Sequence, residues 1–299
     1  MAPIPDPRPT VGLIGLGNMG AAVAERLLDA GYELVLHNRT PEKAAPLAER
    51  GGTVAAAPSK LAAGVDVVLT SLSDDDALES VSADVIAAAR PGTVLVDLST
   101  VSPEASARIA AAAERAGVDF VRAPVSGNPS VVRAGNVTFI VSGPDDAVDR
   151  VLPVLLAVGP TVHRVGDREQ ARVVKLAINL VIGGLAELMS EALVLGEGAG
   201  VSRQALLEVM GSSAAGAPFV KYKTEPLLRD DYSATFTTNL MEKDLELVLG
   251  AAEAAGVRLP LANEIKGIVR DAIESGYGDD DFMALFPHLR SASTQEVQR

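Results

Sequence analysis

The chain has 299 residues, of which 48% are hydrophobic and 22% charged, so it can hold two domains and form a packed core. Its formal net charge of −13 argues against nucleic-acid binding, which needs a basic surface. The absence of cysteine excludes disulfides, and the three histidines lack metal-ligand spacing, so we predict no metal site. The first residues lack a basic stretch followed by an apolar core, so we expect no signal peptide and a cytoplasmic protein.

The amino-terminal segment carries the glycine pattern of a dinucleotide-binding turn. An apolar run at 11–14 predicts a strand, and an alanine-rich stretch ending near residue 31 predicts the following helix. The turn between them reads Gly15-Leu16-Gly17-Asn18-Met19-Gly20. In this pattern the first glycine permits a tight turn, the second lets the backbone approach a pyrophosphate, and the third lets helix and strand pack closely. The start of the helix would then hold the phosphates.

The end of the second predicted strand, residues 34–37, indicates which dinucleotide binds. NAD-binding turns usually place Asp or Glu there to bond the ribose 2′-hydroxyl. This chain has Asn38, Arg39 and Thr40 instead. A planar guanidinium suits a phosphate, and Thr40 adds a hydroxyl donor, so we predict a 2′-phosphate site and a preference for NADP(H) over NAD(H). In the alternative, Thr40 and Pro41 simply begin the next helix and Arg39 is solvated.

The rest of the first half alternates β-rich runs with alanine-rich helical stretches. Strands are expected at 65–72, 93–98, 119–125, 136–141 and 162–165, and a helix is expected at 103–116. The acidic runs at 74–76 and 279–281 predict helix starts. Such alternation is typical of a parallel sheet covered by helices, here with a partly antiparallel far edge. We therefore predict an α/β fold, with a doubly wound Rossmann domain over residues 1–165.

The pattern becomes helical near residue 166. One long helix is expected from about 168 to 198, with further helices at 203–210, 240–255 and 261–275. We predict an all-helical domain over 166–299, entered by this long interdomain helix. Its apolar run at 173–188 is short and interrupted by polar residues, so we expect no membrane span. A helix this apolar must be covered on most sides, which predicts a homodimer or a higher homo-oligomer.

Two polar side chains on the long helix are candidates for catalysis. Lys175 and Asn179 lie four residues apart, and therefore on one helix face, among apolar neighbours. Burying an unpaired ammonium is costly, so Lys175 either extends to solvent or faces a polar cleft. In a cleft, desolvation lowers the pKa of a lysine and allows proton exchange near neutral pH. These residues alone leave both interpretations open.

Five segments, in this order, resemble the β-hydroxyacid dehydrogenase family over nearly the whole chain. That family includes 3-hydroxyisobutyrate dehydrogenases, tartronate semialdehyde reductases and glyoxylate/succinic semialdehyde reductases. The matching segments are the glycine signature at 12–20, Asp97-Leu98-Ser99-Thr100, Ala123-Pro124-Val125-Ser126-Gly127, the Lys175 and Asn179 pair, and Lys243-Asp244-Leu245.

The resemblance implies an oxidoreductase that moves a hydride between NADP(H) and a small carboxylate-bearing substrate. That substrate would be a β-hydroxy acid, a semialdehyde or a 2-oxo acid, bound between the domains. Lys175 would be the general acid or base, with Asn179 as its partner. The substrate would contact Ser126, Gly127, Asn128 and Thr100. The cofactor would contact Gly15, Leu16, Gly17, Asn18, Met19, Gly20, Asn38, Arg39, Thr40, Leu72, Ser73, Thr100 and Lys243.

The chain departs from the family pattern around the substrate. Arg122 stands where members commonly have Asp, Asn128 where they have a second glycine, and Ile178 where many have Asn. The segment 167–171, usually glycine-rich, reads Asp-Arg-Glu-Gln-Ala. These changes bear on which substrate is used more than on the class of reaction.

Each candidate also has a purely structural explanation. Ser126 and Gly127 can form an ordinary turn, Thr100 can begin the helix at 103–116, and Lys243 can be a solvated charge. For the whole protein, the alternatives are a non-catalytic NADP(H)-binding module and an imine reductase on the same fold. Relatives of the latter kind usually replace the lysine by Asp or Tyr, which disfavours that alternative.

Overall fold

The chain divides into two compact units inside one long helix. The computed structural model describes residues 8–297; its first unit ends at Lys175 and its second begins at Leu176. The division lies within helix α8 (Gln170–Gly198), further along the chain than the expected boundary at 165/166. That expected boundary stays a prediction.

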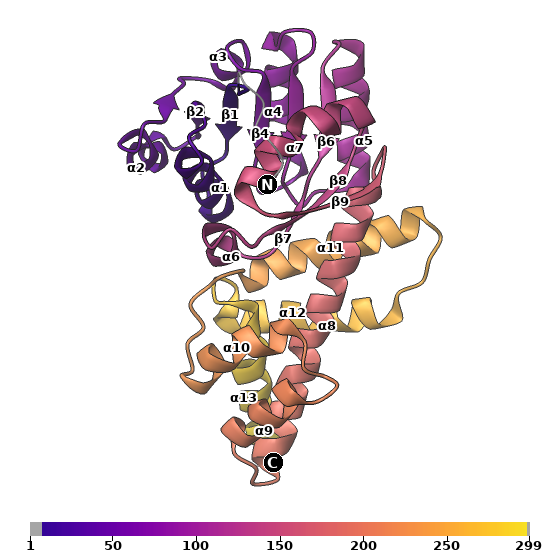
Figure 1. Ribbon diagram of the computed structural model, residues 1–299. Helices are drawn as coiled ribbons and strands as arrows, with labels where there is room; N and C mark the ends of the chain where they lie inside the picture. The colour runs from indigo at the N-terminus through magenta and orange to yellow at the C-terminus, as the bar shows by residue number, and fades with distance from the viewer. Residues whose placement is uncertain (1–7, 298–299) are drawn as a thin grey trace. The chain divides into compact units, whose positions relative to one another are not determined.

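A nine-stranded sheet forms the centre of the first unit, within residues 8–175 (Figure 1). Its strands are β1 (Val11–Ile14), β2 (Leu34–His37), β3 (Thr53–Val54), β4 (Val67–Thr70), β5 (Val94–Asp97), β6 (Asp119–Arg122), β7 (Val125–Ser126), β8 (Thr138–Ser142) and β9 (Thr161–Gly166). Their spatial order is β3-β2-β1-β4-β5-β6-β8-β7, with β9 beside β8. The first six are parallel, and β8 runs antiparallel to β6 and β7. This is the Rossmann strand order, so the predicted doubly wound sheet is confirmed.

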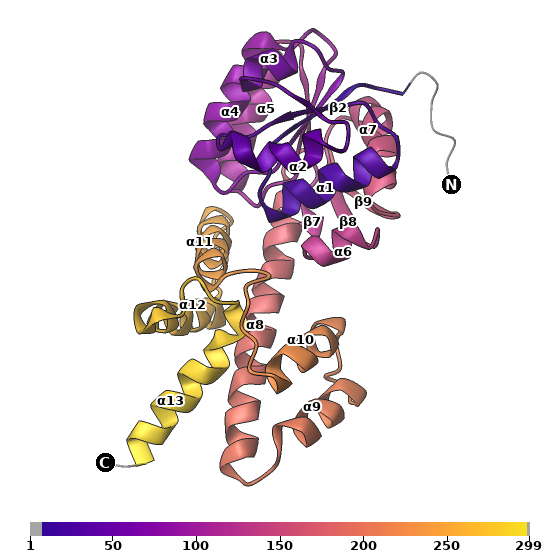
Figure 2. The same cartoon turned by 90° about the vertical axis from the view of Figure 1, so that its left-hand side faces the viewer.

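Helices cover both faces of this sheet (Figure 2). One face carries α1 (Asn18–Asp29) and α7 (Asp145–Val158); the other carries α3 (Pro58–Ala62), α4 (Asp75–Ala88) and α5 (Pro103–Arg115). Shorter helical pieces are η1 (Pro41–Ala44), α2 (Ala45–Ala48) and α6 (Pro129–Arg133). Successive side chains of a strand point to opposite faces, so Leu13 and Ile14 enter different cores. Burial on both faces explains why these strands read as continuous apolar runs.

The prediction of a single strand over 119–125 is wrong. The strand stops at Arg122, and a separate short strand, β7, begins at Val125. Pro124 has no N–H to donate to a ladder, so it interrupts the strand. Its carbonyl still accepts a hydrogen bond from Ile140 N at 3.0 Å. The break turns the chain away from β6, so that Ser126 lies in a strand paired with β8 alone.

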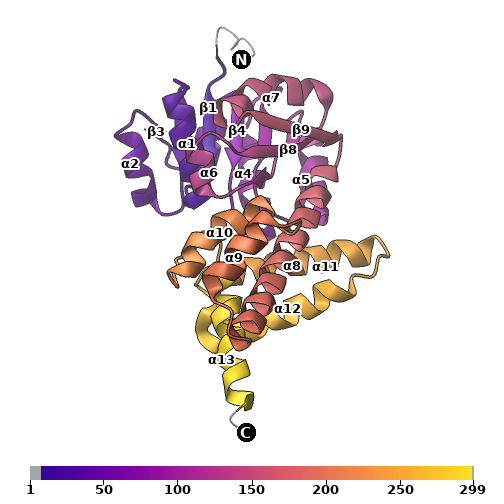
Figure 3. The same ribbon diagram turned by 60° about the horizontal axis from the view of Figure 1, so that its bottom comes forward.

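The regular elements of the second unit are all helical within its described residues, 176–297. Beyond the remainder of α8 it contains α9 (Arg203–Ser212), α10 (Pro218–Leu228), α11 (Thr238–Ala254), α12 (Pro260–Ala272), the π-turn η2 (Ile273–Tyr277), η3 (Phe282–Ala284) and α13 (Leu285–Val297). Figure 3 shows α11 alongside α12 and α9 alongside α10. One isolated bridge joins Thr237 to Asp281. The predicted all-helical character is confirmed, although α10 and α13 were not expected.

Both acidic runs cap a helical segment, but only the second also contains a buried ion pair. Asp74 caps α4 as predicted, its carboxylate accepting from Ala77 N at 2.8 Å. In the second run, Asp281 also caps a helical turn, η3, by accepting from Met283 N at 3.1 Å. Yet Asp281 is buried, and it forms an ion pair with the equally buried Lys223, whose Nζ lies 2.6 Å from Oδ1. The second run is therefore an internal link between α10 and η3 as well as a helix start.

Helix α8 is long and apolar enough to cross a membrane, judged by length and composition alone. Core helices of soluble proteins have the same properties, so this is weak evidence for a span. The absence of a membrane span stays a prediction.

Candidate functional site

The glycine turn between β1 and α1 has the geometry that its sequence predicts. Gly15 adopts φ +96°, and a Cβ there would overlap the carbonyl oxygen of Ser71. A Cβ at Gly20 would overlap the carbonyl oxygen of Gly15. At Gly17, by contrast, a Cβ would meet no atom within 4 Å, and no side chain caps the helix that begins there. An open, uncapped helix start fits a pyrophosphate.

Asn38, which directly follows β2, contacts this turn through its side chain. Its Oδ1 accepts a hydrogen bond from Leu16 N at 2.8 Å, and its Nδ2 donates to the Thr40 carbonyl at 2.9 Å. Arg39 and Thr40 are exposed. Pro41 occupies the first position of η1, but the Thr40 side chain makes no capping bond. The structural alternative therefore accounts for Pro41 and leaves Arg39 available to a ligand.

The ends of β4 and β5 meet beside the turn. Leu72 N donates to Ser99 Oγ at 2.9 Å, which links the two strand ends. The Ser73 hydroxyl donates to Asp74 at 2.6 Å. Thr100 is half-buried, and the cap of α5 is Ser102, which accepts from Ala105 N at 3.0 Å. Thr100 is thus not the residue that starts the helix.

The three residues predicted to bind a carboxylate lie at the end of β7 and in the turn that follows it. Ser126 is half-buried, and Gly127 adopts φ +140°, a conformation that favours glycine. The Asn128 side chain caps α6, because its Oδ1 accepts from Val131 N at 3.0 Å and from the Ser130 hydroxyl at 2.6 Å. The predicted contribution of Asn128 to substrate binding therefore rests on its backbone N–H.

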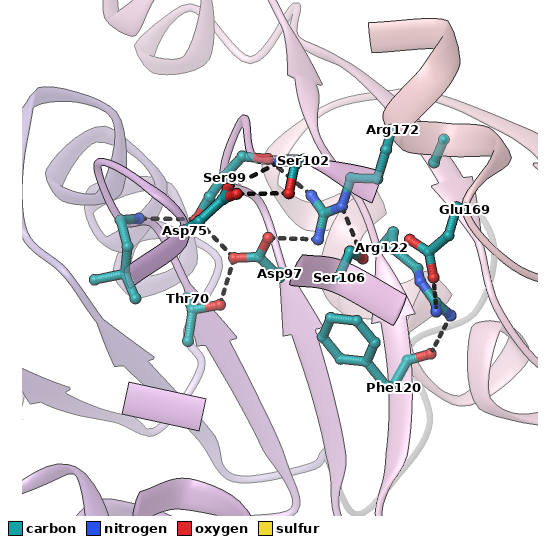
Figure 4. A network of polar contacts seen from close by, with 12 residues as sticks. Thr70, Asp75, Asp97, Ser99, Ser102, Ser106, Phe120, Arg122, Glu169 and Arg172 are labelled. Carbon is teal, nitrogen blue, oxygen red and sulfur yellow. Dashed lines mark hydrogen bonds and ion pairs between the residues drawn. The ribbon is translucent and has the colours of Figure 1, made fainter. Parts of the chain in front are cut away.

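A buried arginine ties the start of α8 to the end of β5, a connection that the sequence analysis missed (Figure 4). Arg172, 1% exposed, forms an ion pair with the fully buried Asp97, with Nη2 2.6 Å from Oδ2. Its Nη1 donates to the Ser99 carbonyl at 2.8 Å, and its Nε donates to Ser106 Oγ at 3.2 Å. Asp97 also accepts from Ser99 and from Thr70, both at 2.6 Å.

A second arginine pair lies next to the first (Figure 4). Arg122 ends β6, and its guanidinium pairs with Glu169 and lies over the Phe120 ring at 4.7 Å. Burial lowers the pKa of Arg122, and the Glu169 carboxylate opposes that shift. Two departures from the family pattern, at residue 122 and in the segment 167–171, are therefore partners in one contact.

Lys175 and Asn179 follow these anchors along α8. Lys175 is half-buried, one turn after Arg172. Asn179 is buried, and its Nδ2 donates to Asp244 Oδ2. The other oxygen of Asp244 lies 2.9 Å from Lys243 Nζ. Asn179, Asp244 and Lys243 thus form one cluster, and because Asp244 is only 1% exposed this pair is not a solvated one. No group of three or more His, Cys, Asp or Glu that could hold a metal occurs among the described residues.

Comparison with known proteins shows the family of the chain. Residues 10–166 match a family model described as the NAD-binding domain of 6-phosphogluconate dehydrogenase. Residues 170–289 match one described as NAD-binding of NADP-dependent 3-hydroxyisobutyrate dehydrogenase. The 2-(hydroxymethyl)glutarate dehydrogenase of Eubacterium barkeri is 32% identical, over 92% of this chain and 93% of its own. The chain belongs to the β-hydroxyacid dehydrogenase family.

Solved structures extend the likeness to three dimensions. A 3-hydroxyisobutyrate dehydrogenase of Mycobacterium tuberculosis, described with L-serine, has a TM-score of 0.86 and 31% identity, covering 94% of this chain and 99% of its own. An imine reductase from Pseudomonas sp. has a TM-score of 0.61 at 24% identity, covering 94% and 99%, and shares the fold. This member of the family is an oxidoreductase that acts on CH–OH groups with a nicotinamide cofactor.

Proposed function

We propose that this dehydrogenase is NADP(H)-dependent and reduces a small carboxylate-bearing semialdehyde or 2-oxo acid, or oxidises the corresponding hydroxy acid, with Lys175 as its general acid or base. One observation carries the proposal. Arg172 fixes the first turn of α8 to Asp97 and to the Ser99 carbonyl. Lys175 is one turn later on that helix, and Thr100 directly follows Ser99. The helix start that carries Lys175 is therefore held at the strand end expected to border the nicotinamide.

The chain offers donors for a substrate carboxylate in the same unit. The Ser126 hydroxyl lies at the end of β7, and the backbone N–H groups of Gly127 and Asn128 follow it in the turn before α6. Donors of this kind suit an anion, and they would orient the substrate by its carboxylate. Thr100 adds a hydroxyl at the end of β5. We infer that these groups orient the carbonyl carbon for hydride transfer, while other residues transfer a proton to or from the substrate oxygen.

Lys175 transfers this proton. When bound, the nicotinamide would supply a hydride to the carbonyl carbon in reduction, or take one from the carbon of the alcohol in oxidation, and negative charge would develop on the oxygen during reduction. The Lys175 ammonium donates a proton to that oxygen, or its amine removes one in the reverse direction. The cation also stabilises the developing alkoxide electrostatically. Asn179 would hold Lys175 or the substrate in line, and Lys243, oriented by Asp244, would contact the cofactor.

Replacing Lys175 tests the mechanism. We expect Lys175→Ala to lower kcat on the order of 10²-fold or more, the scale of positioned acid–base catalysis. NADPH oxidation is followed by absorbance with a panel of small semialdehydes and keto acids, and NADPH affinity is measured separately. Equal turnover by both proteins would contradict the proposed role. NADPH binding without turnover on any carbonyl would favour the binding module, and turnover on imines alone would favour an imine reductase.

Replacing Arg39 tests the cofactor preference. Loss of a charge-assisted contact to the 2′-phosphate would weaken NADPH binding by roughly 10- to 100-fold, whereas NADH lacks that phosphate and should bind as before. We expect this pattern for Arg39→Ser, measured by fluorescence titration with both cofactors. The matched control is Lys43→Ser, which removes another exposed cation nearby. If Arg39→Ser weakened both cofactors equally, or neither, the predicted phosphate contact would not exist.

A further inference from the structure

We infer that Glu169 and Arg172 are positioning residues for Lys175, each anchoring the first turn of α8 to a different strand end. This inference rests on the proposed role of Lys175 and adds the residues that hold its helix in place. Neither residue needs to touch substrate or cofactor. Both act through the placement of the helix backbone.

The anchor through Arg172 fixes the direction of its side chain. The guanidinium has three separate partners, Asp97, the Ser99 carbonyl and Ser106 Oγ, so its plane cannot rotate without breaking a bond. Arg172 and Lys175 are three residues apart, and side chains at this spacing lie on neighbouring parts of one helix surface. Holding Arg172 therefore sets the rotation of the helix on which Lys175 stands.

The anchor through Glu169 acts on the backbone at the helix start. The Glu169 carbonyl accepts from Arg172 N at 3.0 Å and from Val173 N at 3.2 Å. Glu169 therefore directly precedes α8 and accepts hydrogen bonds from its first turn. Its carboxylate pairs with Arg122, the residue directly before the 123–127 segment. The contact thus joins the start of the lysine helix to the chain that leads into the proposed carboxylate-binding turn.

The two ion pairs, Arg172 with Asp97 and Glu169 with Arg122, contact the sheet at adjacent positions. Asp97 and Arg122 are direct partners in the register of β5 and β6, one strand spacing apart. Ser142 on β8 makes a third contact at the helix start, where its Oγ accepts from Ala171 N at 3.2 Å. Beside that contact, the two side-chain anchors on neighbouring strands set both the rotation of the helix and its distance from the sheet. Proton transfer requires such placement, because a misplacement of about 1 Å can cost as much as 10²-fold in rate.

The test compares two size-conserving variants with and without Lys175. Glu169→Gln removes the charge of one anchor, and Arg172→Lys removes the guanidinium fork of the other. In the otherwise wild-type protein we expect each to lower kcat by roughly 10-fold, since the lysine is displaced while NADPH affinity is unchanged. In the Lys175→Ala background the same changes should cost nothing further, because residues acting through one group are not additive. Arg168→Gln, an exposed neighbour in the same segment, is the matched control and should behave as the wild type.

Amide hydrogen exchange on the protein without ligands gives a readout independent of turnover. Glu169→Gln should speed exchange at the first-turn amides of α8, residues 171–174, and leave the later turns unchanged. If Arg172→Lys does not fold, Glu169→Gln carries the test alone, since the Glu169 side chain lies at the edge of the network with 20% exposure.

The outcomes separate the two proposals. An equal loss of kcat with and without Lys175 would show a general structural role and overturn this inference alone. Unchanged kcat or unchanged exchange in Glu169→Gln would also overturn it. Full activity of Lys175→Ala by itself would overturn the proposed function, and this inference with it.

Discussion

At the scale of single residues, Glu187 is a buried acid outside the proposed site. It lies on α8, only 4% exposed, and neither carboxylate oxygen has a hydrogen-bond partner within the part of the chain that the structure describes. Burial raises the pKa of Glu187 from its ordinary value near 4.5 to about 7, with a smaller contribution from Glu191. An acid with a raised folded-state pKa stabilises the fold only while it remains protonated.

This shift predicts a pH dependence of stability. Below pH 4.5 the carboxyl group is protonated in both states; between pH 4.5 and 7 only the folded state keeps the proton; above pH 7 the fold holds a buried charge. The free energy of unfolding should therefore fall by about 3 kcal/mol as the pH rises through this window. Urea unfolding of Glu187→Gln at several pH values should lack this loss, while Glu191→Gln, an exposed neighbour, should largely keep it. Parallel pH profiles for wild type and Glu187→Gln would contradict the assignment.

At the scale of elements, local sequence signals were enough wherever a structure depends on neighbouring residues. The glycine turn and the Asp74 cap of α4 need only their own few residues, and both have the predicted form. Helices α10 and α13 escaped prediction because packing, and not a strong periodic pattern, determines them: Phe219 and Phe286 belong to the core of the second unit. The break at Pro124 was within reach of the sequence, because a proline inside a predicted strand is itself a signal.

In the candidate site, too, the sequence predicts residues that belong to local motifs and misses those whose partners are distant in the chain. Gly15, Arg39 and Lys175 could be named from motifs. Arg172 could not be assigned a role, because its partner Asp97 is 75 positions away, and Asn179 and Asp244 are 65 positions apart. A charged residue in the first turn of an otherwise apolar helix was the available signal for Arg172. The pairing of Arg172 with Asp97 is known only from the three-dimensional structure of the end of β5.

At the scale of the whole molecule, α8 presents an apolar stripe that residues 8–297 leave uncovered. Val181, Leu188 and Leu195, each seven residues from the next, are 60%, 57% and 75% exposed. Leu261 on α12 continues the stripe, and a groove of about 360 Å³ is lined by Val181, Leu188 and Leu261 among other residues. Residues repeated every seven positions share one side of a helix, and a soluble protein seldom exposes so continuous an apolar surface without a partner. A second copy presents the same stripe, so a two-fold dimer would cover both.

We therefore predict a homodimer that buries this stripe. The wild-type protein should sediment as a dimer at micromolar concentration, and Leu188→Glu or Leu195→Glu should sediment as monomers, since each would bury an unpaired carboxylate in an apolar interface. Val209→Glu is the matched control: Val209, on α9, is 66% exposed and lies outside the stripe, so this variant should stay dimeric. A monomeric wild type would show that the stripe is uncovered in solution. Charged variants that remain dimeric would place the interface elsewhere, because two like charges facing each other across the stripe would oppose association.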